Sequence, residues 1–152
     1  QYFDIYSGLS AWHTKLKNQV LQTGTVTLPS GRQLHWDNVE RQQSGRVTYS
    51  TQIVNYPVQS FATADIVPLA CIRAYKMLKA KQAKSVCVLT VHDSIVVDVH
   101  PDEEELCKDI LVKAMKHVDE EVFSRYRYQM VMPLDIEIKS GPNWLEGKVI
   151  YE

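Results

Sequence analysis

The chain has 152 residues, of which 45% are hydrophobic and 23% are charged, and its net charge is −1. This composition excludes an intrinsically disordered chain, and the near-neutral charge excludes a protein that nucleic acid holds by overall positive charge alone. No apolar run approaches the roughly 18 residues that a membrane span needs, so we expect one soluble globular domain over residues 1–152, with no membrane partner.

The first segment predicts an amphipathic helix. Apolar residues recur at spacings of three and four from Tyr2 to about Leu21, and Gly24 is a typical helix end. Because this helical pattern begins at Gln1 rather than after a methionine, we expect the chain to be a piece of a longer protein.

The next segment predicts a hairpin followed by a loop. β-Branched and aromatic residues alternate over residues 25–36, on both sides of the turn Pro29-Ser30-Gly31. Residues 37–45 are polar and show no periodicity, which predicts a surface loop. Residues 47–51 are either a short strand or only an extended run.

A long helix is predicted to begin at Asn55-Tyr56-Pro57, because proline suits the first helical turn, and to run to about Lys79. Pro68 lies inside it, which predicts a kink or the loss of one backbone hydrogen bond. Basic residues gather near its end and complement the negative end of the helix dipole without any ligand. They are Arg73, Lys76, Lys79, Lys81 and Lys84.

The second half predicts a hairpin, a helix and a strand. Two β-branched runs, 85–91 and 95–99, flank His92-Asp93-Ser94, which predicts a buried hairpin with a polar tip. Asp102 and Glu105 have the spacing of a capping box, and an apolar stripe extends this predicted helix to about Tyr126. Residues 133–138 alternate with period two, as in a last strand. The fold class that follows is α+β: a small antiparallel sheet packed against long helices.

The predicted hairpin tip is the candidate site. An aspartate at the apex of an apolar hairpin is costly to desolvate, so Asp93 requires solvent, a cation or a metal ion. The alternative is an ordinary turn, in which short polar side chains bond nearby backbone groups. A Ser-His-Asp hydrolase is excluded, because His92, Asp93 and Ser94 are consecutive and cannot line up as a relay.

Neither the histidines nor the cysteines have the spacing of a zinc site. The histidines are His13, His35, His92, His100 and His117. The three cysteines, Cys71, Cys87 and Cys107, form no CxxC pair and favour reduced core thiols in a cytoplasmic protein.

The run from Val91 to Asp98, VHDSIVVD, resembles the motif C hairpin of family A DNA polymerases, the bacterial polymerase I and phage polymerase type, which is usually VHDE before an apolar strand. Residues 55–66, NYPVQSFATADI, are similar to the family's N-x-P-[IV]-Q-x-x-A-A-D-I signature. The turn Leu28–Arg32 resembles its T-x-x-GR turn, and Ser140–Trp144 resembles its G-x-N-W ending. Residues 1–12 resemble the segment after the fingers helix, so the resemblance spans essentially the whole chain.

The resemblance implies the C-terminal part of a polymerase palm with adjoining fingers. The family's motif A strand, with the other metal-binding aspartate, and its motif B helix, which holds the incoming triphosphate, would lie upstream of Gln1. Two Mg²⁺ ions would serve the complete enzyme, and Asp93 would be one of their ligands. Asp98 could not complete the pair, because five strand residues span about 16 Å. We therefore expect the isolated chain to be inactive.

The resemblance also assigns three residues to DNA. His92 would approach the backbone at the primer terminus as a catalytic-site residue, and Asn55 and Gln59, four apart on one helix face, would bond minor-groove acceptors. Without the resemblance, His92 is equally a turn histidine bonded to backbone, Asn55 a helix cap and Gln59 a solvated side chain. The partners implied are primer–template DNA, deoxynucleoside triphosphates and the missing N-terminal polymerase portion.

Four positions depart from the family pattern. Ser94 replaces the usual Glu of motif C and alters the charge beside Asp93; Thr51 stands where an arginine is usual. Phe61 replaces a small residue, and Pro68 interrupts the helix, so the duplex-facing surface is expected to differ in shape.

Three functions remain open from the sequence. The first is the catalytic C-terminal portion of a DNA-directed DNA polymerase, phage-like because of the HDS variant, in a bacterial or phage-infected cytoplasm. The second is a catalytically silent DNA-binding module or accessory subunit derived from such an enzyme. The third is an α+β interaction domain whose HDS turn is ordinary.

Overall fold

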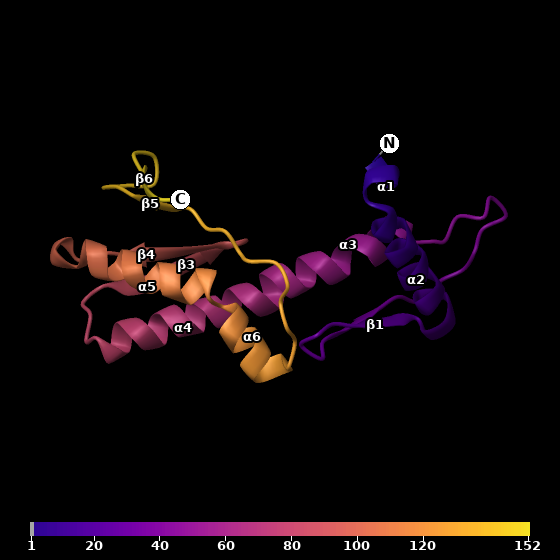
Figure 1. Cartoon of the computed structure of the whole chain (residues 1–152), viewed down its shortest axis with the longest axis horizontal. Coiled ribbons are helices and arrows are strands. Elements are labelled where there is room, and N and C mark those ends of the chain that lie inside the picture. Colours follow the sequence, from indigo (N-terminus) through magenta and orange to yellow (C-terminus); the bar gives the residue numbers. More distant parts are fainter. Residues whose placement is uncertain (1) are drawn as a thin grey trace. The chain divides into compact units, whose positions relative to one another are not determined.

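Helices and three two-stranded antiparallel sheets make up residues 2–152, which the computed structural model describes (Figure 1). The predicted α+β class is confirmed, although the strands form three separate hairpins rather than one sheet. The chain divides into two compact units, which we call unit 1, up to Ala62, and unit 2, from Thr63. The expectation of a single domain stays a prediction. Within the described residues, no helix is long and apolar enough to cross a membrane.

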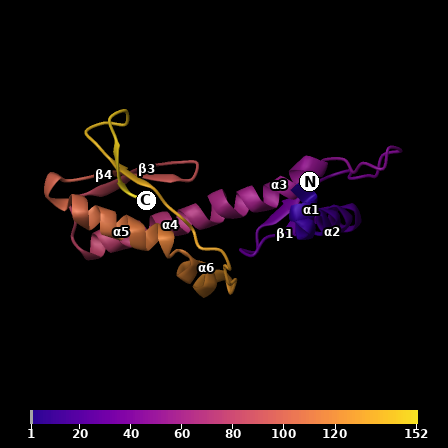
Figure 2. The ribbon, with the colours of Figure 1, turned by 45° about the horizontal axis from the view of Figure 1, so that its top comes forward.

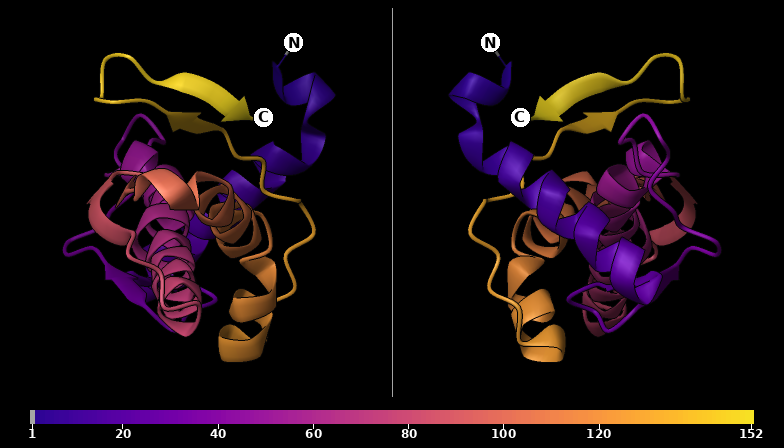
Figure 3. Two further views of the ribbon diagram at one scale, coloured as in Figure 1. Left: turned by 90° about the vertical axis from the view of Figure 1, so that its left-hand side faces the viewer. Right: turned by 90° about the vertical axis from the view of Figure 1, so that its right-hand side faces the viewer.

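Unit 1 begins with two helices where the sequence predicts one. α1 spans Tyr2–Ile5 and α2 spans Ser7–Thr23, because Tyr6 leaves the helical conformation with a φ of −109° and a ψ of 60° (Figure 3). Gly24 ends α2 as predicted: its φ is 68°, and its N–H donates to the Val20 carbonyl at 2.8 Å. The positive φ explains the glycine, since other residues are strained there.

The predicted first hairpin is confirmed. β1, Thr25–Thr27, pairs with β2, Gln33–His35, and the Leu28 N–H donates to the Arg32 carbonyl across the turn. The hairpin and α2 enclose the core of unit 1. That core consists of Leu16, Val20, Val26, Leu28, Trp36, Val47 and Ile53.

α3 spans Ser50–Ser60, so the predicted helix entry at Asn55 is wrong by five residues. Val47 only forms an isolated bridge with Arg41, and the chain then turns into the helix. Ile53, fully buried, and Pro57, also buried, are four residues apart on the inner face of α3. Burial of that face extends the helix upstream and leaves Pro57 in its interior.

The irregularity expected at Pro68 takes the form of a π-helix. η1, Phe61–Ile66, is π-helical, and α4, Val67–Ala80, follows with Pro68 in its first turn. Proline cannot donate to the carbonyl four residues earlier, and its ring displaces that carbonyl. A wider π turn directly before Pro68 accommodates this clash.

In unit 2 the predicted second hairpin is present, and it lies along α4 and α5 (Figures 1 and 2). β3, Val86–Val91, pairs with β4, Ser94–Asp98, with a bulge between Cys87 and Leu89. Its inner face packs on Ala74, Leu78, Cys107, Ile110 and Ala114. The expectation of a buried hairpin is wrong for the outer face, because Val86, Val88 and Leu89 are about half exposed. The three cysteines are free thiols.

Two helices replace the predicted helix that ends near Tyr126. α5 spans Glu104–Lys116 and α6 spans Asp119–Tyr126. The Arg73 guanidinium of α4 donates to the His117 carbonyl and, at 2.5 Å, to a Glu120 carboxylate oxygen, so it holds the bend. Arg73 therefore joins α4 to the α5–α6 bend, a role that the helix-dipole interpretation of the basic residues did not include. Val118 and Val122 stay buried across the bend, as the apolar stripe predicts.

The C-terminal segment differs from its prediction. Residues 133–137 form no strand; β5 spans Ile138–Ser140 and pairs with β6, Lys148–Tyr151, which the sequence analysis did not find. Only Ile138 of β5 is buried, so a short strand with one buried residue carries little periodic signal.

Glu103, not Asp102, organises the start of the α5 region, so the predicted capping box is wrong. Pro101–Glu103 form a 3₁₀ turn, η2, and the Asp102 N–H donates to the His100 side chain at 3.3 Å. One Glu103 oxygen accepts from the Lys84 N–H at 3.0 Å. The other accepts from the Ser85 N–H at 2.8 Å and the Ser85 hydroxyl at 2.6 Å. The buried Ser85 oxygen accepts in turn from the His100 N–H at 2.9 Å.

These donors lower the pKa of Glu103 from 4.5 to about 2, chiefly through the Lys84 N–H and then the Ser85 hydroxyl and N–H. A carboxylate whose folded pKa is depressed stabilises the fold above its unfolded pKa, and this contribution is lost as pH falls from 4.5 towards 2. We expect Glu103→Gln to lower the melting temperature at pH 7, and the difference from wild type to shrink on acidification through that window.

Glu104→Gln is the matched control, because Glu104 is an exposed neighbouring carboxylate on α5. Thermal unfolding followed by circular dichroism from pH 7 to pH 2 measures both variants. Equal melting temperatures for the two variants at pH 7 would contradict the role of Glu103.

Candidate functional site

The tip of the β3–β4 hairpin is a two-residue turn of His92 and Asp93. Ser94 already belongs to β4, where it pairs with Val91 and its hydroxyl donates to the Val91 carbonyl at 2.8 Å. His92 has a φ of 54°, in the left-handed region. Tight hairpin turns require positive φ, which His tolerates better than most residues but not as well as glycine.

Asp93 is exposed at this tip, and within the described residues its carboxylate forms no hydrogen bond or ion pair. The ordinary-turn alternative holds for Ser94, whose hydroxyl bonds the backbone of the turn, but not for the Asp93 side chain. His92 is also exposed and bonds no backbone group in the described part of the chain, so the corresponding alternative for it is wrong as well.

The tip fits a hard divalent cation such as Mg²⁺ only as one ligand of several. A carboxylate with both oxygens open to solvent is the donor that Mg²⁺ prefers. Residues 2–152 contain no group of three or more His, Cys, Asp or Glu side chains that could hold a metal ion. Asp98 lies at the opposite end of β4, paired with Val86, and Asp65 is buried in η1. Further ligands for an ion bound to Asp93 would have to come from outside the described residues.

Asn55 and Gln59 share one exposed face of α3, which we call the amide face. Thr51 lies one turn earlier on the same stripe and is also exposed. Ile53 and Pro57 occupy the opposite, buried side. The helix-cap alternative for Asn55 is wrong, because α3 begins at Ser50 and Asn55 lies in its interior. An exposed asparagine inside a helix is about 0.5 kcal/mol less favourable than alanine, so helix stability does not explain an asparagine at this position.

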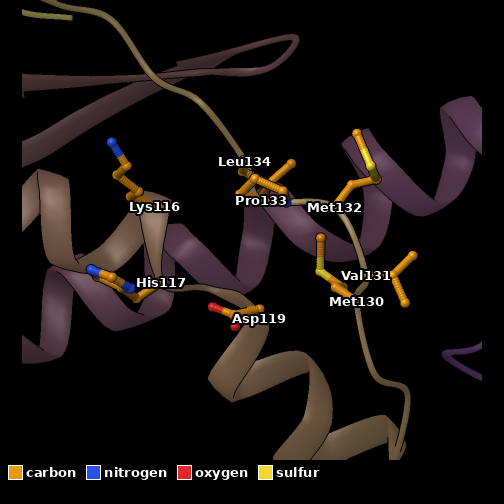
Figure 4. Close-up of a pocket in the computed structure, with 8 residues that line it drawn as sticks. All are labelled: Lys116, His117, Asp119, Met130, Val131, Met132, Pro133 and Leu134. Atoms are coloured by element: carbon orange, nitrogen blue, oxygen red, sulfur yellow. The ribbon is translucent and has the colours of Figure 1, made fainter.

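A cavity of about 270 Å³ in unit 2 lies away from the hairpin tip (Figure 4). It is lined by Lys116 and His117 at the end of α5, by Asp119 at the start of α6 and by the extended segment Met130–Leu134. Lys116 donates to the Tyr151 hydroxyl at 3.1 Å, and this bond raises the pKa of Lys116. The sequence analysis missed this cavity because its residues come from two separate segments, 116–119 and 130–134, with no shared motif.

A family model described as DNA polymerase family A matches residues 1–146. DNA polymerase I of Treponema pallidum is 30% identical over 150 residues, which cover 95% of this chain and 14% of that protein. DNA polymerase I of Caldicellulosiruptor bescii is 27% identical over 149 residues, which cover 97% of this chain and 16% of that protein. The chain thus spans only a small part of the length of these relatives.

Among solved structures, the POL domain of Pol1 from M. smegmatis, in complex with DNA primer-template and dNTP, matches with a TM-score of 0.73. It is 23% identical in sequence, and the match covers 89% of this chain and 22% of that chain. This likeness shows that the two share a fold.

The positive φ of His92 predicts how substitutions at this position change the free energy of unfolding. Glycine adopts the φ of 54° without strain, whereas a β-branched residue is strongly disfavoured there. We expect His92→Gly to leave the free energy of unfolding unchanged or raise it by up to about 1 kcal/mol. His92→Val should lower it by about 1–2 kcal/mol.

Urea unfolding of the two variants beside wild type measures these changes. A destabilised His92→Gly would mean that the imidazole itself supports the folded hairpin, contrary to its exposed position.

Proposed function

Because the chain belongs to DNA polymerase family A, whose model matches residues 1–146, we propose that it supplies part of the polymerising machinery of a DNA-directed DNA polymerase. The complete enzyme would transfer nucleotides from deoxynucleoside triphosphates to a primer paired with a template. The observation that carries this proposal is the exposed Asp93 at a tight hairpin tip, with no partner among the described residues. The chain spans 14–16% of its relatives' length, so the remaining parts would come from elsewhere in the polymerase.

Asp93 is proposed to hold a divalent metal ion, as a carboxylate oxygen donor fixed on a short turn. When bound, the metal supplies charge stabilisation for the attacking and leaving oxygens of nucleotidyl transfer. The Ser94 hydroxyl is bonded to the Val91 carbonyl, so we propose that Ser94 shapes the turn and leaves metal binding to Asp93. His92 is proposed to donate an imidazole N–H to a phosphate or sugar oxygen at the primer terminus.

The amide face is proposed to grip the primer–template duplex. Asn55 and Gln59 lie one turn apart on the exposed side of α3, where amide groups can bond the acceptors that every base pair presents in the minor groove. Such contacts suit an enzyme that must hold any sequence. Thr51 cannot supply the positive charge of the arginine usual at its position, so the grip would depend on these two amides.

These relatives are bacterial proteins, and we propose that the complete polymerase works in a bacterial or phage-infected cytoplasm. A catalytically silent DNA-binding module remains the second candidate, because Ser94 stands in place of the motif C Glu. Activity measurements on Asp93 variants separate the two candidates.

In the complete polymerase, Asp93→Asn should reduce the turnover number at least about 100-fold, because it removes the charge that binds the metal and keeps the size of the side chain. Ser94→Ala should reduce it less than about tenfold, since it removes a bond within the turn, worth about 1 kcal/mol. Primer extension with Mg²⁺ and a fluorescent primer measures both. Equal effects of the two substitutions would contradict metal binding by Asp93, and a polymerase inactive before substitution would favour the silent module.

For the amide face, Gln59→Ala in the complete polymerase should weaken primer–template binding by roughly 1 kcal/mol, about fivefold, whatever the duplex sequence. Because a neutral amide releases no counterions, the slope of log affinity against log salt should not change. Asn55→Ala should weaken binding similarly and leave the melting temperature unchanged or slightly higher, since Asn55 is not a helix cap.

Gln22→Ala is the matched control, because Gln22 is an exposed glutamine on α2. Fluorescence anisotropy titrations at several salt concentrations compare the three variants. Affinities equal to that of the control would mean that the amide face does not contact DNA.

A further inference from the structure

Unit 1 contains a cavity of about 230 Å³ whose lining carries three cations. Lys17 comes from α2, and Arg41 and Arg46 come from the loop before α3. Thr14, Asn18 and Ser50 supply neutral polar groups to the same lining, and no carboxylate lines it. We call this cavity the basic pocket.

The positive charge of the basic pocket is uncompensated. Within the described residues, Lys17 and Arg46 form no ion pair. The Arg41 guanidinium donates to the Gly45 carbonyl at 3.1 Å and to the Asn18 amide oxygen at 3.3 Å, both neutral acceptors. These two bonds orient the guanidinium without neutralising it.

The surroundings of the pocket add to its positive potential. Unit 1 carries five basic residues against three acidic ones, Asp4, Asp37 and Glu40, of which Asp37 lies 2.9 Å from His35. α3 begins at Ser50, on the rim of the pocket, with no acidic residue in its first turn and no side-chain cap. The positive end of this helix therefore supports the three cations, although by itself it would not form a site.

We propose that the basic pocket binds a phosphate group. Guanidinium groups match phosphate oxygens in a bidentate manner, and the lysine adds a point charge. The proposal rests on the proposed function in one respect: we infer that the phosphate belongs to the backbone of bound DNA, which presents such groups in a polymerase complex. A free anion such as pyrophosphate has the same chemistry, and the experiment separates these two sources.

The sequence analysis did not find this pocket because its cations are separated along the chain. Lys17 lies 24 positions before Arg41, and the near-neutral total charge gives no sign of it. The fold brings them together by packing the loop against α2, where Arg41 contacts Asn18.

The test uses the complete polymerase with Arg46→Gln and, separately, Lys17→Gln. Lys15→Gln is the matched control, because Lys15 lies on α2 and does not line the pocket. The first measurement is primer–template affinity over a series of salt concentrations. The second is calorimetric titration of the DNA-free polymerase with inorganic pyrophosphate, and thermal unfolding shows that each variant is folded.

If the pocket binds a backbone phosphate, each pocket variant should reduce the salt slope by about 0.9 and weaken duplex binding roughly tenfold at low salt, whether or not pyrophosphate binding also falls. If the occupant is a free anion, pyrophosphate affinity should fall and the slope should not, which supports a phosphate site but overturns its assignment to DNA. If the salt slope of duplex binding and the pyrophosphate affinity of the pocket variants both equal those of Lys15→Gln, the proposal is overturned. Loss of turnover in Asp93→Asn is independent of these outcomes, so the proposed function and the pocket can fail separately.

Discussion

The Glu103 carboxylate fixes the base of the hairpin on which the candidate site depends. It accepts hydrogen bonds from the two residues that precede β3, and Ser85 passes the connection to the His100 N–H after β4. Both ends of the hairpin are thereby joined to the start of α5. Because a two-stranded hairpin alone is at best marginally stable in water, this clamp and the packing of Cys87 and Val97 on the α4–α5 core determine where the tip lies within unit 2.

At the tip, backbone strain and an exposed carboxylate with no protein partner in the described part of the chain occur together. His92 takes a positive φ that glycine would adopt more easily, and Asp93 is left without a partner among the described residues. Neither feature stabilises the fold, whereas Ser94 closes the turn with its hydroxyl. Residues that a turn does not need structurally are those expected at a site that binds a ligand. The same reasoning applies to Asn55, which lies exposed within a helix that it does not cap.

The two units differ in charge although the whole chain is nearly neutral. Unit 1 has a net charge of +2, and unit 2, with 12 basic and 15 acidic residues, has −3. The excess of positive charge accompanies the proposed phosphate and duplex contacts of unit 1, and the excess of negative charge accompanies the proposed metal ligand of unit 2. This separation would let unit 1 attract an anionic polymer although the chain as a whole is not basic.

The sequence by itself determined the α+β class, the end of α2 at Gly24, the β1–β2 and β3–β4 hairpins and the polar tip at Asp93. Turn residues and apolar periodicity are local signals, so these features could be predicted. It also carried the family resemblance that the match over residues 1–146 confirms. Only the tertiary structure decided where α3 begins, since burial of Ile53 outweighs the local preference of Asn55-Tyr56-Pro57. The same holds for the break between α5 and α6, which Arg73 bridges from α4, and for the Glu103 clamp and the basic pocket. Each of these features joins residues separated by 18 or more positions, and no local pattern records such contacts.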